Sequence, residues 1–181
     1  MDTNFKLGFC PTMANIAIEL KGENNFIELY PLGSAAEALF YLKQGAMDGI
    51  VIGRFAKQAE ISQQIDKHCL QKEGYTLISH QKGFVEFEHI GRLQVHTYLP
   101  ENLVREKFPE LKKIKFHPTK TAALQNVNST EVALIDWHDY DDRWELMIPV
   151  DEGGKIKKYR LPILYFQKKK AELAGKIASN K

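Results

Sequence analysis

Two segments of this 181-residue chain share one local pattern, and this repeat constrains the fold more than any other feature of the sequence. The segments cover residues 27–36 and 114–123, and each runs from a β-rich stretch through a proline to a hydroxyl residue and two alanines. The hydroxyl residue is Ser34 in the first segment and Thr121 in the second. A hydroxyl before a helical pattern caps the helix, whose first N–H groups and positive dipole end attract anions. The repeat predicts two strand–loop–helix units, each with an edge suited to an anion.

The N-terminal part of the chain predicts a β-α-β-α-β order. Short β-rich runs at residues 6–10, 26–30 and 50–52 alternate with apolar residues at helical spacing, which begin after Thr12 and Ser34. Strands that alternate with helices of this length form a parallel sheet with right-handed crossovers. We therefore expect a first lobe built on such a sheet.

The middle of the chain predicts a third helix and then a passage to a second lobe. Ile61, Ile65 and Cys69 are spaced like residues on one face of a helix. Residues 75–79 are expected to form a strand, and residues 81–91 are interpreted as the first crossing between the lobes.

The second half of the chain repeats the β-α-β-α-β order. Its strands are expected at residues 93–98, 114–116 and 132–135, and its helices after Pro100 and from Thr121. Residues 144–150 would return to the first lobe, residues 151–154 would form a turn, and residues 171–178 would form a closing helix.

The predicted fold class is α/β, with two βαβαβ lobes whose central sheets are mixed and mainly parallel. Lobe 1 would comprise residues 1–85 plus 145–181, and lobe 2 would comprise residues 86–144.

One stretch of the first lobe resembles a known family. Residues 39–52, with the sequence LFYLKQGAMDGIVI, contain the pattern L-x-x-G-x-x-D followed by apolar residues. This pattern is similar to one in type II periplasmic-binding-protein folds, which include solute-binding proteins of transporters and effector domains of LysR-type regulators. Residues 6–12 and 26–34 match the first two strand–helix junctions of that family. The resemblance covers the whole chain and implies two lobes with a ligand cleft between them.

The sequence also departs from that family. It is shorter than most transporter receptors, and its first residues, MDTNFK, lack the basic start and apolar centre of a signal peptide and a lipid-anchor cysteine. A helix-turn-helix segment does not precede the binding region either. We therefore expect a bare ligand-binding core, similar to small cytoplasmic proteins related to solute-binding lipoproteins.

Charge and composition limit the kinds of binding partner and site that we expect. The 25 basic residues are offset by 23 acidic ones, so the net charge of +2 gives no general case for nucleic acid. No stretch approaches the roughly 18 apolar residues that a membrane span needs. Cys10 and Cys69 have no metal-ligand spacing, and reduced thiols in the cytoplasm are the simpler interpretation. The basic runs at residues 155–158 and 168–170 are expected to be solvated surface.

The ligand would lie where the carboxyl ends of strands meet the N-termini of helices, as the resemblance implies and as α/β folds generally show. In lobe 1 the candidate residues are Thr12, Met13, Gly33, Ser34 and Arg54. In lobe 2 they are Tyr98, Thr119, Lys120, Thr121, Asp136 and Trp137.

The candidate residues suit a small anion. Arg54 offers a bidentate fork, whose charge-assisted bonds are about twice as strong as neutral ones, and Lys120 adds a point charge. Gly33 permits close backbone approach. The hydroxyls of Thr12, Ser34 and Thr121 would donate hydrogen bonds to a carboxylate, sulfonate or phosphate. Tyr98 and Trp137 would form an aromatic wall of the site, and Asp136 would bind an amine group of the ligand.

Structural explanations remain open for several of these residues. Ser34 and Thr121 would cap helices without any ligand, and Arg54 would form an internal salt bridge. Trp137 would cover an edge of the core. Cys10 precedes a proline after a strand, but no partner base is identifiable, so a small buried residue is the simpler interpretation.

The densest polar cluster, residues 136–143, has the sequence DWHDYDDR. It contains groups suited to a divalent metal or to acid–base chemistry, but its spacing matches no metal motif, and a hydrated connection between the lobes is the preferred interpretation. The chain contains no Walker loop, no G-x-G-x-x-G and no G-x-S-x-G. We expect neither a metal nor a cofactor.

The first of three hypotheses is noncatalytic capture of a small anionic metabolite by a cytoplasmic sensor or carrier. The second is a biosynthetic enzyme on the same two-lobed fold, in which Asp136, His138 or Cys10 would act on the ligand. The third is a regulatory module with a degenerate cleft that docks on a partner or forms a homodimer.

Overall fold

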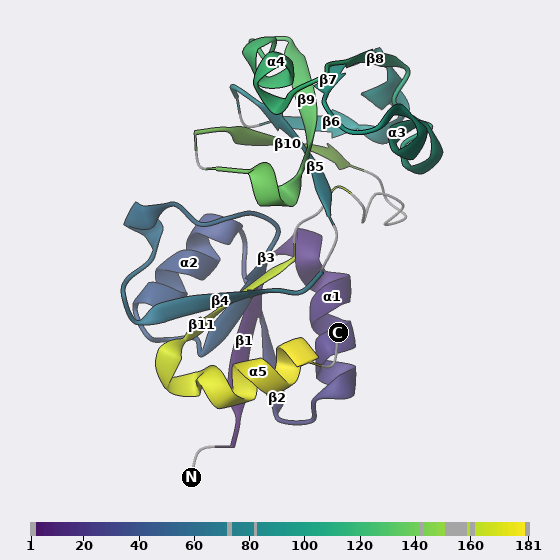
Figure 1. Cartoon of the computed structure of the whole chain (residues 1–181). Helices are drawn as coiled ribbons and strands as arrows, with labels where there is room; N and C mark the ends of the chain where they lie inside the picture. Colours follow the sequence, from purple (N-terminus) through teal and green to yellow (C-terminus); the bar gives the residue numbers. More distant parts are fainter. Residues whose placement is uncertain are drawn as a thin grey trace. The chain divides into compact units, whose positions relative to one another are not determined.

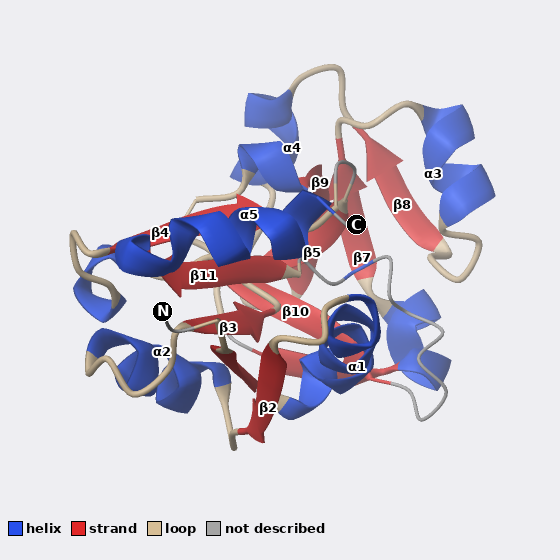
Figure 2. Cartoon of the chain, turned by 90° about the horizontal axis from the view of Figure 1, so that it is seen from below, coloured by secondary structure: helices blue, strands red, loops and turns tan. Residues whose placement is uncertain are grey.

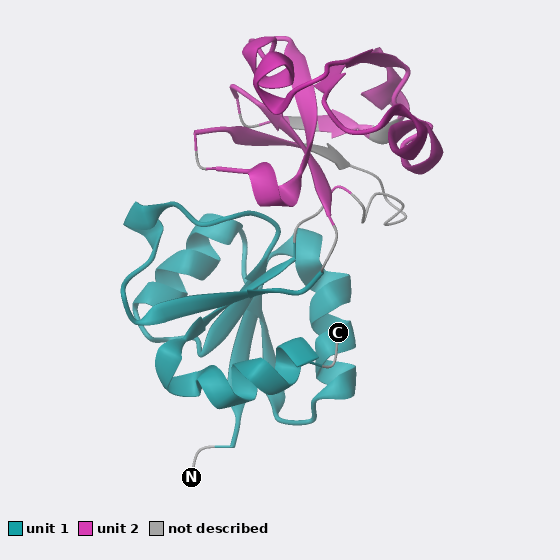
Figure 3. Cartoon of the chain, viewed as in Figure 1, with its two compact units in different colours: residues 1–72, 161–181 teal, residues 73–160 magenta. Residues whose placement is uncertain are grey.

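The computed structural model of the chain describes residues 3–71, 74–81, 83–141, 143–150, 159 and 162–179. It divides into two compact units, shown in teal and magenta in Figure 3. Unit 1 comprises Met1–Lys72 and Leu161–Lys181, and unit 2 comprises Glu73–Arg160. The turn expected at residues 151–154, the basic run at residues 155–158 and Asp142 lie outside the described residues.

Unit 1 contains a five-stranded mixed sheet with helices on both sides. The strands are β1 (Phe5–Phe9), β2 (Ile27–Pro31), β3 (Gly49–Ile52), β4 (Ile65–Cys69) and β11 (Ile163–Gln167). The helices are α1 (Ala14–Glu23), α2 (Ala35–Lys43) and α5 (Ala171–Ser179), with short 3₁₀ helices η1 (Pro11–Met13), η2 (Gln58–Glu60) and η6 (Lys168–Lys170). The strand order is β2-β1-β3-β11-β4. Helices α1 and α2 lie on opposite sides of the parallel strands, and α5 runs along β11 and β4 (Figure 2).

Unit 2 contains a six-stranded mixed sheet. Its strands are β5 (Tyr75–Ser79), β6 (Gly83–Glu86), β7 (Gln94–Thr97), β8 (Lys113–Phe116), β9 (Glu131–Asp136) and β10 (Glu145–Val150). Its helices are α3 (Glu101–Lys107) and α4 (Lys120–Gln125), with 3₁₀ helices η3 (Phe87–Arg92) and η4 (Trp137–Asp139). The strand order is β6-β10-β5-β9-β7-β8.

The two sheets follow the same plan. In unit 1, β1 pairs in parallel with β2 and β3, and β11 joins β3 and β4 by antiparallel pairing. In unit 2, β7 pairs in parallel with β8 and β9, and β5 joins β9 and β10 by antiparallel pairing. The order β2-β1-β3-β11-β4 therefore corresponds to β8-β7-β9-β5-β10, with β6 added at one edge of unit 2 (Figure 1). The prediction of an α/β fold with two βαβαβ units and mixed sheets is confirmed.

Alternating side chains of β9 explain why helices cover both faces of the sheet in unit 2. Val132 and Leu134 belong to an apolar cluster with Val104 of α3. Ala133, which points to the other face, belongs to a second cluster, against which Leu124 of α4 packs. A run of apolar residues buried on both faces is typical of a central strand.

The motif on which the family resemblance rests has a structural role in unit 1. Gly45 follows α2 and has a φ of 80°, a backbone conformation that favours glycine and ends the helix. Three residues later, Asp48 Oδ2 accepts a hydrogen bond of 2.8 Å from the backbone nitrogen of Lys6. The same oxygen lies 3.8 Å from Lys170 Nζ. The motif thus ends α2 and ties the start of β3 to β1 and to η6.

The predicted third helix is wrong. Residues 65–69 form β4, which pairs antiparallel with β11 so that Ile65 lies opposite Gln167. Residues four positions apart share one face of a helix, but they also share one face of a strand. The spacing of Ile65 and Cys69 was therefore compatible with both structures, and pairing with a strand nearly 100 residues later decides between them.

The observed division of the chain differs from the expected one. Strands β5 and β10, which we assigned to lobe 1, belong to unit 2, because β5 pairs with β9 and β10 pairs with β5. Residues 83–91, part of the expected crossing, contribute β6 and most of η3 to unit 2. The units meet in sequence at Lys72 and Glu73 and again at Arg160 and Leu161, instead of at 85/86 and 144/145.

Among the described residues, no helix combines the length and apolar character that crossing a membrane requires.

Candidate functional site

The predicted ligand residues lie at the carboxyl ends of parallel strands, and each unit brings its own set to one edge of its sheet. In unit 1, Thr12 and Met13 follow β1, Gly33 and Ser34 follow β2, and Arg54 follows β3. In unit 2, Tyr98 follows β7, residues 119–121 follow β8, and Asp136 and Trp137 lie at the end of β9. This edge is where open α/β sheets bind ligands.

The start of α2 in unit 1 already holds a carboxylate. Ser34 Oγ caps the helix by accepting a hydrogen bond of 3.1 Å from the backbone nitrogen of Glu37. In return, Glu37 Oε2 accepts a hydrogen bond of 3.0 Å from the backbone nitrogen of Gly33. A Cβ atom at Gly33 would lie 2.7 Å from that oxygen, so glycine allows the carboxylate to approach. An external anion at this helix start would have to displace Glu37.

Arg54, at the carboxyl end of β3, binds Glu60 through two parallel hydrogen bonds. The distances are 2.9 Å from Nη1 to Oε1 and 2.7 Å from Nη2 to Oε2. Nη1 also donates to the carbonyl oxygen of Phe55 at 2.9 Å. The guanidinium lowers the pKa of Glu60 most strongly, burial opposes it, and the backbone nitrogen of Lys57 lowers it further. Arg54 therefore has the internal salt bridge that the sequence left open, and a ligand anion would compete with Glu60 for it.

The residues that follow β1 combine a core contact with a half-buried hydroxyl. Met13 is 1% exposed, and its Cε atom lies 3.1 Å from the position that a Cβ atom at Gly53 would take. Met13 therefore fills the space that Gly53 leaves. Cys10 is buried, as expected, with its Sγ atom 3.3 Å from Thr12 Oγ1.

In unit 2, one hydrogen-bonded network connects three of the candidate residues. The hydroxyl of Tyr98 accepts a hydrogen bond of 3.1 Å from the backbone nitrogen of Asp136 and donates to Asp139 Oδ2. Asp139 Oδ1 lies 3.4 Å from Lys120 Nζ. The network joins the carboxyl ends of β7 and β9 to the first residue of α4.

Asp139 is the centre of this network, and we did not predict it as a site residue. The signal was its place in the acidic cluster at residues 136–143, but only the fold shows that it faces Tyr98 and Lys120. Burial raises the pKa of the Tyr98 phenol, and the hydrogen bond to Asp139 raises it further. Tyr98 thus keeps its proton at neutral pH and remains a hydrogen-bond donor.

Asp136 and Trp137 have local partners. Asp136 Oδ1 accepts a hydrogen bond of 2.9 Å from the backbone nitrogen of His138 and so caps η4. The indole of Trp137 stacks on the imidazole of His138 with the ring centroids 3.7 Å apart.

The cap of α4 is Thr119, and the assignment to Thr121 is wrong. Thr119 Oγ1 accepts a hydrogen bond of 3.1 Å from the backbone nitrogen of Ala122, whereas Thr121 lies exposed within the helix. The repeat aligned Thr121 with Ser34, but α4 begins at Lys120, two residues before Ala122, the residue that the repeat aligns with the start of α2. Ala122 takes the position that Glu37 holds in α2, so the first turn of α4 carries no carboxylate.

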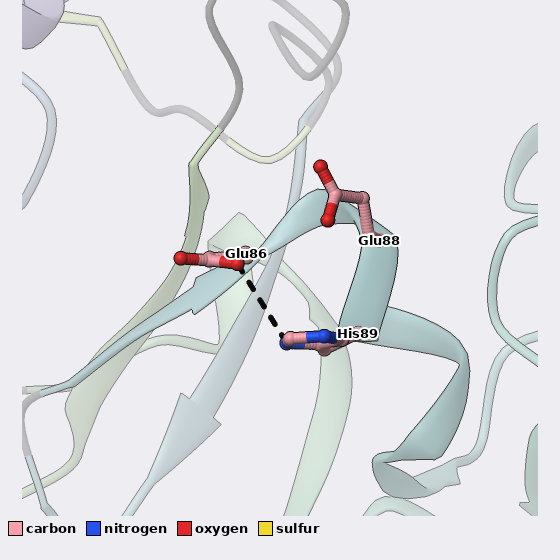
Figure 4. A group of neighbouring side chains, drawn as sticks. All are labelled: Glu86, Glu88 and His89. Atoms are coloured by element: carbon pink, nitrogen blue, oxygen red, sulfur yellow. Dashed lines mark ion pairs between the residues drawn. The ribbon is translucent and has the colours of Figure 1, made fainter.

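A second polar group lies where β6, the edge strand next to β10, leads into η3. Glu86, Glu88 and His89 place ligand-type atoms within 4.8 Å of one another, and all three side chains are exposed (Figure 4). His89 Nδ1 lies 3.8 Å from Glu86 Oε2. Exposed acidic groups often lie this close without a metal, and we assign no site to them.

Comparison with solved structures finds similarity over nearly the whole chain. An ABC-type phosphate transport receptor from Vibrio cholerae is 14% identical, with 97% of this chain and 93% of that chain covered and a TM-score of 0.44. The regulatory domain of OxyR2 from Vibrio vulnificus, as a C206S mutant, is 13% identical, with 98% and 93% covered and a TM-score of 0.42. The BenM effector-binding domain with its effector benzoate is 14% identical, with 91% and 83% covered and a TM-score of 0.35. These proteins have type II periplasmic-binding-protein-like folds.

No protein-family model matches the sequence. No curated protein matches it either.

Proposed function

We propose that the protein binds a small molecule without converting it, as a sensor or carrier, through the carboxyl edges of its two sheets. The observation that carries this proposal is the hydrogen bond between Tyr98 and Asp136 in unit 2. It lies at the carboxyl ends of β7 and β9, the neighbouring parallel strands at which the chain changes from one face of the sheet to the other. Ligands of open α/β sheets bind at such a switch point.

The site favours an anionic ligand that exchanges with the protein's own carboxylates. Arg54 is paired with Glu60 and Lys120 with Asp139, so both cations already have negative partners. A ligand carboxylate, sulfonate or phosphate could replace either partner and leave the cation satisfied. The released carboxylate would then be solvated by water instead of being buried without a partner.

This exchange limits the affinity. Micromolar binding corresponds to about 8 kcal/mol, and a hydrogen bond to a charged group contributes about 1.5–3 kcal/mol. Because the exchange breaks bonds of the same kind as those it forms, we expect micromolar or weaker binding.

A thermal-shift screen tests the proposal. The ligand set comprises phosphate, sulfate, carboxylates, sulfonates and amino acids, each tested with the whole chain. A ligand present at one hundred times its dissociation constant raises the free energy of unfolding by about 2.7 kcal/mol. This increase corresponds to a rise of several degrees in Tm for a chain of this size. The proposal fails if no ligand class raises Tm.

Two controls connect a positive result to the site. Tyr98→Phe removes the hydroxyl from the network and should abolish the shift, whereas Tyr41→Phe on α2 should preserve it. Mass spectrometry after incubation should recover the ligand unchanged, and a new product would identify an enzyme instead.

A further inference from the structure

A chain of three titratable side chains lies beneath α4, outside the predicted ligand set. His96 of β7 is 1% exposed, and its Nδ1 atom lies 2.9 Å from Nε2 of His117. Its other ring nitrogen, Nε2, lies 3.1 Å from Oε1 of Glu131. Glu131 is the first residue of β9, and its second oxygen accepts a hydrogen bond from the side-chain amide of Asn128. A buried imidazole therefore connects a carboxylate to a second imidazole.

The carboxylate determines which nitrogens carry protons. Glu131 accepts hydrogen bonds, because its pKa is lowered by the Asn128 amide and then by His96. The Nε2 atom of His96 must therefore carry the proton that faces Glu131. In a neutral imidazole the other nitrogen is then an acceptor, so Nδ1 of His96 accepts a hydrogen bond from the Nε2–H group of His117. When both imidazoles are neutral, these three side chains thus have one consistent arrangement of protons.

The hydrogen bond between His96 and His117 persists when one proton is added to the pair of imidazoles, but not when two are added. If one of the two imidazoles gains a proton, a donor and an acceptor still face each other between His96 and His117. If both are protonated, two N–H donors meet at the same contact and the hydrogen bond is lost. Burial lowers the pKa of His117, and the charges of His96 and Lys115 lower it further.

The hydrogen bond between His96 and His117 lies at the junction between β8 and α4. The backbone nitrogen of His117 donates to the carbonyl oxygen of Thr97 at 2.8 Å, and two residues later Thr119 caps α4. The next residue, Lys120, belongs to the network around Asp139. Loss of the contact between the imidazoles would release the segment that positions both the helix cap and Lys120.

We propose that Glu131, His96 and His117 form a proton-operated latch, which holds the β8–α4 junction of unit 2 and opens when both imidazoles are protonated. The charged groups that face the latch are Lys115 on β8, which adds repulsion, and Glu131 on β9, which opposes it. Lys120 on α4 is paired with Asp139. In the described part of α4 there is no further charged side chain.

The latch would also regulate the ligand site, and this consequence rests on the proposed function. In acid, release of Lys120 would weaken anion binding, although protonation of a histidine alone would strengthen it. The latch opposes the simple electrostatic trend, and this opposite sign makes its effect recognisable.

Nitrogen-15 NMR of the histidine side chains in the whole chain tests the latch directly. At pH 7.5 we expect His96 as the Nε2–H tautomer and His117 with its proton on Nε2. As pH falls from 7.5 to 5.0, amide exchange at His117 and Ala122, relative to intrinsic rates, should rise about tenfold to a hundredfold per pH unit, the slopes for linkage to one and to two protons. Other tautomers, or exchange that does not depend on pH, would overturn the latch.

Two variants provide controls. In His117→Gln the side-chain amide still donates to His96 but does not take up a proton, so the acid-induced rise in exchange should disappear. His89→Gln removes an exposed histidine of the same unit and should behave like the wild type. The latch is contradicted if His117→Gln keeps the rise in exchange.

Phosphate binding, measured at pH 7.5 and 5.0, separates the latch from the ligand site. If the proposed function is wrong, phosphate binds at neither pH and the NMR result is unaffected. If the latch alone is wrong, phosphate binds but its pH dependence is the same in the wild type and in His117→Gln.

Discussion

Arg54 and Glu60 form two parallel hydrogen bonds at the carboxyl end of β3, in the place where an anionic ligand is expected. The side chains are 20% and 25% exposed, so water reaches the pair only partly. Glu37 at the start of α2 and Asp139 beside Lys120 occupy comparable positions. In each case an internal carboxylate uses the donors that the sequence suggested for a ligand.

Glu60→Gln should strengthen anion binding, because it removes the competing charge and keeps the size of the side chain. The same change should lower the free energy of unfolding by about 1 kcal/mol or less, since a partly exposed pair is screened by solvent. Titration calorimetry with the best anion from the screen, together with urea unfolding, measures both effects. Glu101→Gln, which breaks the exposed pair with Arg105, is the matched control and should leave affinity unchanged. A loss of stability with no gain in affinity for any anion would show that the pair is structural only.

Glu60 should also make the stability of the fold depend on pH in the acidic range. Its folded pKa lies below the ordinary value, so its stabilising contribution is present above the unfolded pKa of 4.5 and is lost as pH falls through the folded pKa. The decline in unfolding free energy below pH 4.5 should therefore be shallower in Glu60→Gln than in the wild type. Identical pH profiles for the two proteins would refute the contribution.

Tyr98 should have the opposite dependence on pH. Its pKa is raised by burial and by Asp139, so the folded state retains a proton that the unfolded state loses above about pH 10. Stability should fall as pH rises above that value. Tyr98→Phe should reduce the fall, as measured by urea unfolding between pH 8 and 11. An equal fall in stability in the wild type and in Tyr98→Phe would contradict the assigned environment of Tyr98.

The two threonines at α4 should differ in their effect on stability. Thr119→Ala removes the cap and should cost about 1 kcal/mol, whereas Thr121→Ala lies on the exposed surface and should stay within about 0.5 kcal/mol of the wild type. Urea unfolding of the two variants compares neighbouring residues of the same type. A larger loss for Thr121→Ala would restore the cap that the sequence repeat suggested.

The sequence predicted local structure well where one pattern allowed one answer. Ser34 with its following alanines begins α2, and the continuous apolar run at residues 50–52 lies within β3. The prediction failed where pairing with a distant strand determines the secondary structure, because the spacing of Ile65 and Cys69 fits a helix and a strand equally. Strand pairing also placed β5 and β10 in unit 2, which local spacing does not reveal.

The candidate site was predicted by position but not by partners. The rule that ligands lie at the carboxyl ends of parallel strands placed Arg54 and Tyr98 at the edges of their sheets. The identity of Glu60 and Asp139 as their partners depends on how loops fold back over those edges. His96 and His117, 21 positions apart, showed no shared pattern in the sequence, because β7 and β8 bring them together.

Chemical-shift mapping tests ligand binding at the sheet edges most directly. The nitrogen-15-labelled chain would be titrated with phosphate and with the carboxylates and sulfonates of the screen. The proposal predicts saturable shifts centred on the backbone amides of Arg54, Tyr98, Lys120 and Asp136, and loss of the shifts at Tyr98, Lys120 and Asp136 in Tyr98→Phe. Shifts confined to residues away from these strand ends, or no saturable shift with any anion, would contradict it.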